Sequence, residues 1–276
     1  MMARKTSRAP EDPATVQIAT WNVNSIKSRL DLVLRWLAEA KPDVVCLQEI
    51  KCVDEAFPRA AIEDAGYHVA VHGQKTYNGV AILSRSPIED ATPRLPGDDG
   101  DDHARFIEAV VSTPSGSVRV AGIYLPNGNP APGPKYDYKL AWMKRLQAYA
   151  ADRLALEEPL VIAGDYNVIP AAQDAKRPDA WVEDALFRPD TRAAWRRLLA
   201  LGLTEAVRAC DDSSGLYSFW DYQAGAWQKN DGIRIDHLLL SPQAADRLVS
   251  TRIDKHVRAW ERPSDHVPVV AEFAFG

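Results

Sequence analysis

Cysteine is scarce in this 276-residue sequence, and the positions of the few cysteines exclude two kinds of stabilised fold. There are three, Cys46, Cys52 and Cys210, and they form no C-x-x-C pair. A disulfide framework uses an even set of cysteines, and a structural zinc site uses closely spaced cysteine or histidine ligands. Neither is indicated, so we expect a protein of the reducing cytoplasm.

The amino-terminal residues lack any long apolar run. The first fifteen residues, MMARKTSRAPEDPAT, are polar, charged and proline-containing, which does not fit a signal peptide or a membrane anchor. We interpret residues 1–15 as a disordered arm. Residues 16–276 are expected to form a single domain, because no loop-like stretch in them is long enough to be an interdomain linker.

An excess of basic charge is also missing, since 33 Lys and Arg face 38 Asp and Glu, giving a formal net charge of −5. Proteins that hold nucleic acid mainly by a basic surface carry clustered Lys and Arg. A protein rich in metal-binding carboxylates can still bind a polyanion, because the ion and a local basic rim supply the attraction. Net charge therefore decides little here.

Short runs rich in valine and isoleucine recur along the chain and predict β-strands at 16–21, 44–48, 80–84, 106–111, 118–124, 160–165, 235–240 and 267–273. Helical patterns lie between some of them, at 29–40, 136–156 and 191–201. Strands follow one another directly in the first half after Tyr67, which favours an antiparallel or mixed sheet. We expect helices to cover the sheets from outside.

Two further segments stand out by composition. The acidic run 98–102 (DDGDD) is interpreted as a solvated loop rather than a metal site, because crowded carboxylates on flexible backbone lack fixed geometry. The segment 217–227 (YSFWDYQAGAW) is unusually aromatic, and either a core-packing turn or a stacking surface fits that composition.

Polar side chains recur where the apolar runs begin or end, and their joint occurrence is the main functional signal. Any one of them alone reads as a turn former or cap. Together they form a repeated pattern: Asn22 and Asn24, Gln48 and Glu49, Asp165 and Asn167, Asp236 and His237, Asp265 and His266. Neighbouring strand residues point to opposite faces, so we expect Asp236 to meet His266 from another strand and His237 to be structural.

These residue types suit the hydrolysis of a phosphodiester. That reaction needs a cation on the phosphate, an activated water and donors that follow charge onto the phosphoryl oxygens. Carboxylates and amides supply the hard oxygen ligands that magnesium prefers, while asparagine, tyrosine and protonated histidine supply the donors. We favour Asp165 as the base, with Asn167 leaving the same side of the chain two residues later.

Seven motifs then resemble, in order and spacing, the signatures of the exodeoxyribonuclease III family in the endonuclease/exonuclease/phosphatase superfamily: WNVNS, LQEIK, HGQKTYNGVAILSR, GIYLPNG, GDYNVIP, GIRIDHLLLS and PSDHVPV. The resemblance runs from about residue 16 to residue 273. It implies an α/β fold of the DNase I-like type, a four-layer α/β/β/α sandwich with two mixed β-sheets packed face to face and a metal site at one edge.

The same resemblance implies roles for individual residues. The implied catalytic residues are Tyr124, Asp165, Asn167, Asp236 and His266, with Asp165 deprotonating the attacking water. The metal site and its surroundings would use Asn22, Asn24, Glu49, Asp165, Asn167, Asp265 and His266, with Glu49 as the principal ligand. The implied substrate contacts are Asn22, Lys75, Arg105, Tyr124, Phe219, Trp220, Ile233 and Arg234, of which Phe219, Trp220 and Ile233 lie near the pocket for a sugar without its base.

As a whole, the resemblance implies a Mg²⁺-dependent DNA repair phosphodiesterase, with Mn²⁺ as a substitute ion. Such an enzyme is a 3′-to-5′ exodeoxyribonuclease and an apurinic endonuclease that cuts 5′ to abasic sites, leaves a 3′-hydroxyl and removes 3′-phosphates. Its partner is double-stranded DNA with abasic sites or 3′ ends. We expect a cytoplasmic monomer that does not associate with membranes.

Three alternatives remain open at this point. The same metal chemistry serves hydrolases of RNA, nucleotides or phosphoinositide-like esters. A glycosidase could use two carboxylates such as Glu49 and Asp165, and its insensitivity to a chelator would reveal it. A catalytically silent DNA-binding module would have lost Asp165, Glu49 or His266, and all three are present.

Overall fold

The computed structural model describes residues 15–114 and 116–275, and its centre is two six-stranded sheets. The expected arm lies outside the described residues except for Thr15, which is instead the first residue of a strand. The strands are β1 (Thr15–Asn22), β2 (Val44–Gln48), β3 (His68–His72), β4 (Val80–Ser84), β5 (Ile88–Pro93), β6 (Phe106–Thr113), β7 (Gly116–Tyr124), β8 (Leu160–Asp165), β9 (Thr204–Glu205), β10 (Asp236–Leu240), β11 (Leu248–Ile253) and β12 (Val269–Ala274).

Both sheets are mixed, as the sequence predicts. The first has the order β11-β12-β1-β2-β4-β3, and the second has the order β5-β6-β7-β8-β10-β9. The pairs β1–β2 and β7–β8 are parallel, and the other pairs are antiparallel. Because the parallel pairs sit near the middle of each sheet, both faces of these strands are buried, which explains their continuous apolar sequences.

The sheets pack face to face through a shared aliphatic core. Ile18 and Val44 of the first sheet belong to the same buried cluster as Val120, Val161 and Leu238 of the second. At Gly122 the sheets approach so closely that an added Cβ would lie 3.4 Å from the Cys46 side chain. The core between the sheets therefore fixes their spacing.

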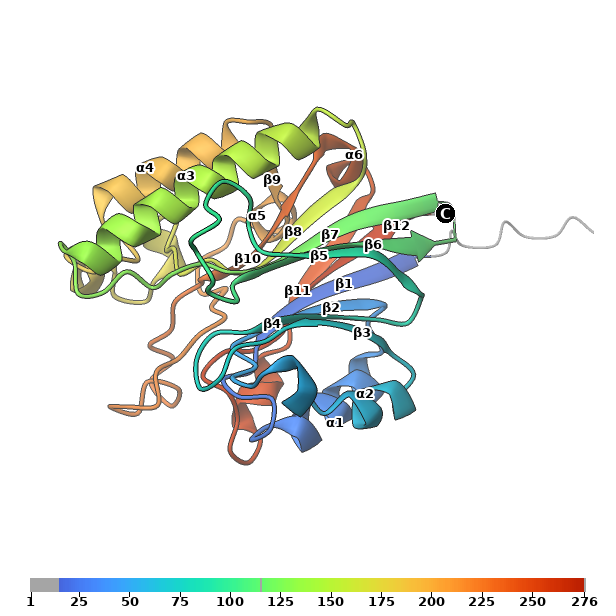
Figure 1. Ribbon diagram of the computed structural model, residues 1–276. Helices are drawn as coiled ribbons and strands as arrows, with labels where there is room; N and C mark the ends of the chain where they lie inside the picture. The colour runs from blue at the N-terminus through green and yellow to red at the C-terminus, as the bar shows by residue number, and fades with distance from the viewer. Residues whose placement is uncertain (1–14, 115, 276) are drawn as a thin grey trace, which may run out of the picture.

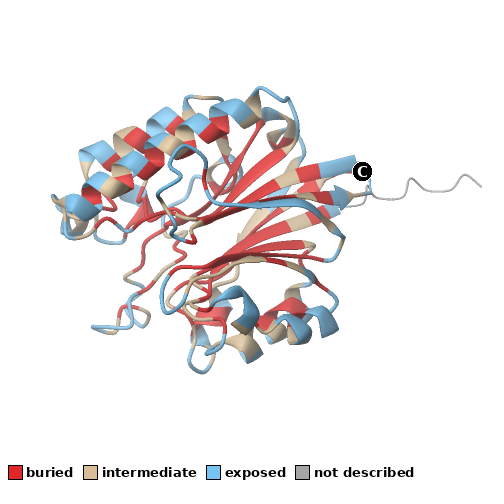
Figure 2. Ribbon diagram, in the orientation of Figure 1, coloured by how far each residue is buried: buried red, intermediate tan, exposed pale blue. Residues whose placement is uncertain are grey.

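Helices cover the outer faces (Figure 1). The α-helices are α1 (Leu30–Ala40), α2 (Arg59–Asp64), α3 (Pro134–Leu154), α4 (Pro189–Leu199), α5 (Ala206–Cys210) and α6 (Pro242–Ala245). Trp36 of α1 packs on the first sheet, and Trp142 of α3 and Trp195 of α4 pack on the second. Figure 2 shows the result as buried strands between helices whose outward faces are exposed. The four-layer sandwich is therefore confirmed.

The long helices begin where sequence chemistry favours a start. Pro134 and Pro189 occupy the first turns of α3 and α4, where a missing N–H costs no hydrogen bond. Asp190 in the first turn and Arg197 in the last turn of α4 match the helix dipole. None of the described helices is both long and apolar enough to span a membrane.

Some expectations need correction. The strands β3, β5, β9 and β11 were not expected, because edge strands and very short strands bury too little to carry an apolar run; β5 is exposed from its second residue onward. The acidic run 98–102 is a loop, but it is not fully solvated. The Asp101 side chain is only 5% exposed, and it accepts hydrogen bonds from Arg145 (2.7 Å) and Tyr138 (3.0 Å).

Candidate active site

The parallel strand pairs deliver polar side chains to one edge of the sandwich. In the first sheet Asn22, the last residue of β1, lies beside Gln48, and Glu49 follows directly. In the second sheet Tyr124 ends β7 beside Asp165, which ends β8. Asp236 of β10 is paired with Asp165 across the antiparallel side. Since parallel strands end at the same edge, the two sheets bring these groups together.

A cavity of about 350 Å³ opens at this edge. It is lined by most of the expected residues, namely Glu49, Tyr124, Asp165, Asn167, Phe219, Ile233, Asp265 and His266. Carboxylates and hydrogen-bond donors line it, and Phe219, whose ring packs on His266 (4.9 Å between ring centres), and Ile233 add an apolar wall. Such a combination suits a ligand with a charged group at one end and an apolar face at the other.

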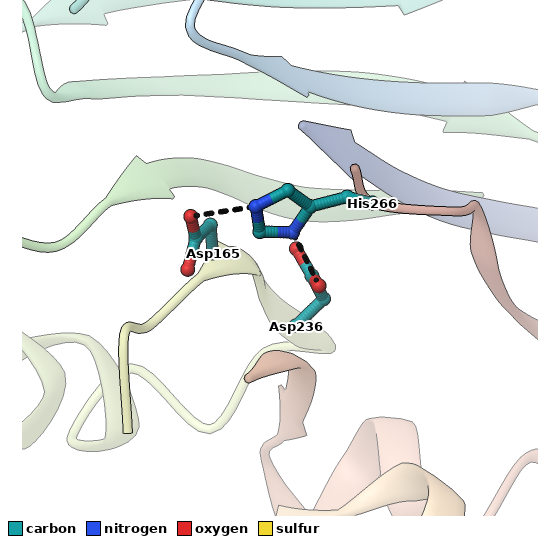
Figure 3. Close-up of side chains that lie close together, drawn as sticks. All are labelled: Asp165, Asp236 and His266. Carbon is teal, nitrogen blue, oxygen red and sulfur yellow. Dashed lines mark hydrogen bonds and ion pairs between the residues drawn. The ribbon is translucent and has the colours of Figure 1, made fainter. Parts of the chain in front are cut away.

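His266 lies between two buried carboxylates (Figure 3). Its Nδ1 is 2.8 Å from Asp236 Oδ2, and its Nε2 is 3.8 Å from Asp165 Oδ2. Burial disfavours the imidazolium, but Asp236 and Asp165 outweigh burial and raise the pKa of His266 to about 10. The ring is therefore protonated at neutral pH. The expected contact between Asp236 and a histidine of another strand is present.

A hydrogen bond from Ser218 helps to hold Asp236 in place. Ser218 Oγ donates a hydrogen bond of 2.6 Å to Asp236 Oδ2, while Oδ1 is buried with no hydrogen-bond partner among the described residues. A carboxylate in this position needs the imidazolium to compensate its charge. Asp236 therefore orients His266 through Nδ1 and leaves Nε2 directed toward Asp165.

The Asp165 carboxylate is oriented by two donors. The backbone N–H of Asn167 donates to Oδ1 (2.9 Å), and the Asn22 amide donates to Oδ2 (3.0 Å). Burial raises the pKa of Asp165 to about 7, and the charge of Asp236 contributes in the same direction. A carboxylate with such a pKa is a stronger base than an exposed aspartate at neutral pH.

Glu49 shares the Asn22 amide with Asp165 and stays ionised. Asn22 Nδ2 donates to Glu49 Oε1 (2.8 Å), and Lys51 Nζ lies 2.9 Å from Oε2. Burial opposes ionisation, but the Asn22 and Lys51 contacts are stronger and lower the pKa of Glu49. Burial, together with the nearby charges of Glu49 and Asp165, raises the pKa of Tyr124 well above its usual value, so the phenol stays protonated.

The oxygen donors of the cavity fit a hard divalent cation. Asp165, Asp236 and His266 lie close enough together to hold an ion. However, a protonated His266 with Nδ1 bonded to Asp236 has no free lone pair for one. The carboxylates of Glu49 and Asp265, which also line the cavity, are the better candidates. Asn24 lies between these groups, since Lys51 Nζ donates to its side-chain oxygen (2.6 Å) and its amide donates to Asp265 (3.1 Å); its role at the ion stays a prediction.

Two expected substrate contacts are wrong. Trp220 is fully buried and donates from its indole to Asn230 (3.1 Å), because neighbouring residues of an extended segment face opposite ways and Phe219 takes the cavity side. Trp220 packs in the core with Val267, so this part of the aromatic segment is a core-packing turn. Arg234 is 1% exposed and cannot reach a phosphate.

Arg234 instead neutralises two buried carboxylates. Its Nε lies 2.8 Å from Asp174, and its Nη1 lies 2.9 Å from Glu205. Arg208 also binds Asp174 (2.6 Å), and His237 contacts Arg234 (3.0 Å) and the Val168 carbonyl (3.0 Å). This network joins the loop after β8 to β9 and β10, and His237 is structural, as expected.

We expect Arg234→Met to lower the free energy of unfolding by about 3–5 kcal/mol, because it removes the buried guanidinium that Glu205 and Asp174 share and leaves Asp174 with Arg208 alone. Urea denaturation measures the change. The exposed Arg197→Met in α4 is the matched control and should stay within about 0.5 kcal/mol of the parent. A stable Arg234→Met with weakened DNA binding would instead restore the phosphate-contact interpretation.

The remaining two expected phosphate contacts lie outside this cavity. Lys75 is exposed on the loop before β4. Arg105 donates to the Tyr124 carbonyl (3.2 Å), with its guanidinium 4.8 Å from the Tyr124 ring centre, and lines a neighbouring cavity together with Asn127 and Asn129. Their contacts with substrate stay predictions.

Sequence reasoning missed several residues of the site: Asn127, Asn129, Lys139, Trp181, Asp184, Leu186, Asp221 and Ile235. All except Lys139 line the cavity, and Lys139 lies buried behind it. Asn127 is part of the GIYLPNG motif and Ile235 is part of the GIRIDHLLLS motif, so for these two the signal was present. The others sit on loops or on a helix whose local sequence gives no functional pattern.

Comparisons with known proteins agree with this geometry. The family model described as "Endonuclease/Exonuclease/phosphatase family" matches residues 19–266. Exodeoxyribonuclease III of Haemophilus influenzae is 34% identical over 94% of this chain and 100% of its own length.

Two solved structures are also similar over 94% of this chain and 99% of their own. They are an AP endonuclease from Archaeoglobus fulgidus (38% identity, TM-score 0.89) and the 3′-phosphatase NExo from Neisseria, bound to a product DNA hairpin (41%, 0.90). This chain belongs to the endonuclease/exonuclease/phosphatase family, and within it to the exodeoxyribonuclease III type that its seven motifs resemble.

Proposed function

We propose that this protein is a magnesium-dependent DNA repair phosphodiesterase that cuts 5′ to abasic sites, degrades 3′ ends and removes 3′-phosphates. Its family and its full-length relatives make it a hydrolytic nuclease of DNA repair. The observation that carries the proposal is the convergence of Glu49, Asp165 and His266 on one cavity. A glycosidase and a silent binding module do not account for that family and that set of groups.

Glu49 and Asp265 would hold the divalent cation, with Asn22 beside them. When bound, Mg²⁺ neutralises charge on the phosphoryl oxygens, and Mn²⁺ can replace it because both prefer oxygen ligands. Lys51 lies 2.9 Å from Glu49 and adds positive charge at the same side of the cavity. An acidic protein can in this way bind a polyanion locally.

Asp165 accepts the proton of the attacking water. Asn22 and the Asn167 backbone fix the two carboxylate oxygens, so the base does not have to reorganise during the reaction. The raised pKa of Asp165 strengthens the base. Asp165 therefore combines position and basicity, the two requirements of a general base.

His266 and Tyr124 supply hydrogen-bond donors to the phosphate. The protonated His266 directs Nε2 into the cavity, where it donates to a phosphoryl oxygen as negative charge builds up. The Tyr124 phenol, kept protonated by burial, donates from the other sheet. No side chain of the cavity has to act as a covalent nucleophile in this scheme.

The apolar wall supports binding of a sugar without its base. Phe219 and Ile233 face the cavity, with Trp181 and Leu186 beside them. An abasic nucleotide has already lost its stacking, so extruding it from the duplex costs less than extruding a paired base. The pocket therefore gives a physical source of selectivity for damaged DNA.

The proposal includes a monomer acting in the cytoplasm. Cys46, Cys52 and Cys210 are free thiols, which suits a reducing compartment.

One assay with three duplexes tests the function: an abasic analogue, a 3′-phosphate and an undamaged recessed 3′ end. With Mg²⁺ we expect a nick 5′ to the abasic analogue that leaves a 3′-hydroxyl, release of phosphate, and slow shortening of the recessed end. Excess EDTA should abolish all three reactions, because the carboxylates alone cannot neutralise the phosphate. Cleavage that persists in EDTA, or cleavage of RNA but not of DNA, would overturn the proposal.

The pH profile gives a separate prediction for Asp236→Asn. Burial favours neutral groups, and the charge of Asp236 both raises the pKa of Asp165 and keeps His266 protonated. Removing that charge lowers both pKa values. The activity needs ionised Asp165 and protonated His266, so it rises with pH through the first pKa and falls through the second.

We therefore expect the whole pH–rate profile of Asp236→Asn to move to lower pH, by at least about one unit on its alkaline side. Rates measured between about pH 6 and pH 10 check the shift. Asp152→Asn, an exposed change on α3, should leave the profile in place. An unchanged alkaline limb in Asp236→Asn would show that His266 does not titrate in the rate.

A further inference from the structure

Lys139 is fully buried in the second turn of α3, behind the cavity rather than in it. Its Nζ donates to two backbone carbonyl oxygens, those of Asn167 (2.6 Å) and Asn127 (3.0 Å). Asn127 belongs to the loop that follows β7, and Asn167 belongs to the loop that follows β8. A single side chain of the outer helix layer thus joins the two loops that end the parallel strand pair.

Stability alone does not explain a lysine at this position. Among the described residues Lys139 makes no ion pair within 4.0 Å, so its charge is compensated only by carbonyl oxygens and by more distant carboxylates. Burial lowers the pKa of Lys139 to about 7, against the opposing effect of Asp165 and Asp184. Burying an amine with so little compensation is unfavourable unless its hydrogen bonds serve a purpose.

The bonds of Lys139 lead directly to the Asp165 carboxylate. Asn167, whose carbonyl binds Lys139, has a left-handed backbone (φ 47°), and its N–H donates to Asp165 Oδ1 (2.9 Å). The Asn167 side chain accepts from Asn127 (3.1 Å) and donates to the Leu125 carbonyl (2.9 Å). Asparagine tolerates the left-handed conformation better than most residues with a Cβ, and these contacts of its carbonyl and its side chain hold it there.

We propose that Lys139 is a positioning residue, which ties the loops after β7 and β8 together and so holds the Asp165 carboxylate in place for water activation. The inference rests on the proposed function. Two N–H donors suffice for the two carbonyls, so the tie forms whether the amine is charged or neutral. Lys139 touches neither substrate nor ion and acts only through Asn127 and Asn167.

The backbone beside Lys139 is shaped to admit its side chain. Gly128, at φ 90°, packs against it, and a Cβ added there would lie 2.7 Å from Lys139 Cδ. Only glycine adopts this φ freely and leaves the space as well. The loop after β7 is therefore built around the lysine, which is what a tie between the two loops requires.

The test compares Lys139→Met, which keeps the length of the side chain and removes both donors, with Lys144→Met on the exposed face of the same helix. We expect kcat on the abasic duplex to fall by about 10- to 100-fold in Lys139→Met, with KM within about threefold. Lys139→Arg keeps the stem as far as Cδ and restores donors, so it should recover most of kcat. Lys144→Met should match the parent.

Combination with Asp165→Asn separates positioning from general damage. If Lys139 acts through the carboxylate, adding Lys139→Met to Asp165→Asn costs less than about twofold more. A full further loss would overturn the proposal. Lys139→Gln has a shorter side chain whose amide reaches only one carbonyl, so its kcat should fall to an intermediate extent. This variant decides the question if Lys139→Met does not fold. A parental kcat in Lys139→Gln contradicts the tie.

Amide hydrogen exchange tests the tie without DNA or metal. In Lys139→Met, exchange should accelerate by about tenfold or more at the Asn167 amide while the amides of β1 and β8 keep their rates. Unchanged exchange at Asn167 overturns the inference even if the nuclease is active. The two proposals can fail separately. If the parent protein cleaves no DNA, but exchange at Asn167 is faster in Lys139→Met than in the parent, the proposed function is overturned and the tie is still supported.

Discussion

Asp165→Asn should lower kcat on the abasic duplex by about 10²- to 10⁴-fold, the usual effect of removing a positioned general base. The amide cannot accept the proton of water. It also places an NH₂ group beside the Asn22 amide, which donates to Asp165 Oδ2 in the parent protein. Single-turnover cleavage with saturating enzyme measures the chemical step separately from binding.

The same substitution should leave DNA affinity unchanged or slightly higher. It removes a negative charge from a cavity that receives a phosphate, so electrostatic repulsion decreases. Binding measured by fluorescence anisotropy on an uncleavable abasic analogue checks this. Asp152→Asn serves as the exposed control, and near-parental turnover by Asp165→Asn would remove Asp165 from the role of base.

His266→Gln should lower kcat by about 10²- to 10³-fold, because it removes a charged donor aimed at the phosphoryl oxygen. Glutamine can still donate a neutral hydrogen bond, but that bond stabilises the developing negative charge less than a bond from the positively charged imidazolium does. The rate at saturating Mg²⁺ and DNA is the measurement. The loss should appear in kcat and in kcat/KM alike, as expected for a contact that strengthens in the transition state.

Folding must be measured alongside this variant. His266→Gln leaves the Asp236 carboxylate buried with only Ser218 as a charge-neutral partner, so the free energy of unfolding should also fall. Urea denaturation gives the folded fraction to which rates are normalised. His256→Gln, a half-exposed histidine paired with Glu39, is the matched control. Parental kcat in His266→Gln would exclude the donor role.

The sequence predicted best those parts of the fold that are buried on both faces. The bounds of β2, β4 and β8 agree with the predicted strands, because every residue of these strands is buried and the apolar run is continuous. The sequence of the edge strand β5 contains no such apolar run, since its residues face solvent. Burial, rather than intrinsic strand preference, made the prediction possible.

Within the site, side-chain direction decided which predictions agreed with the structure. Alternation along a strand correctly separated Asp236, which meets His266, from His237, which points away. The same rule would have separated Phe219 from Trp220, but that segment was not recognised as extended. Arg234 was chosen for its charge, and its partners Asp174 and Glu205 are 60 and 29 residues away, beyond what a local pattern can reveal.

The Asn22 amide makes the active site sensitive to changes in the core between the sheets. It belongs to one sheet and donates both to Glu49 of that sheet and to Asp165 of the other. Both hydrogen bonds can form only at one spacing of the two sheets. A bulkier side chain deep in the interior, for example opposite Cys46 at Gly122, would push the layers apart and stretch this bridge. Mutational tolerance at such remote interior positions is therefore limited by alignment of the reactive groups, and refolding regains activity only once the two layers have docked.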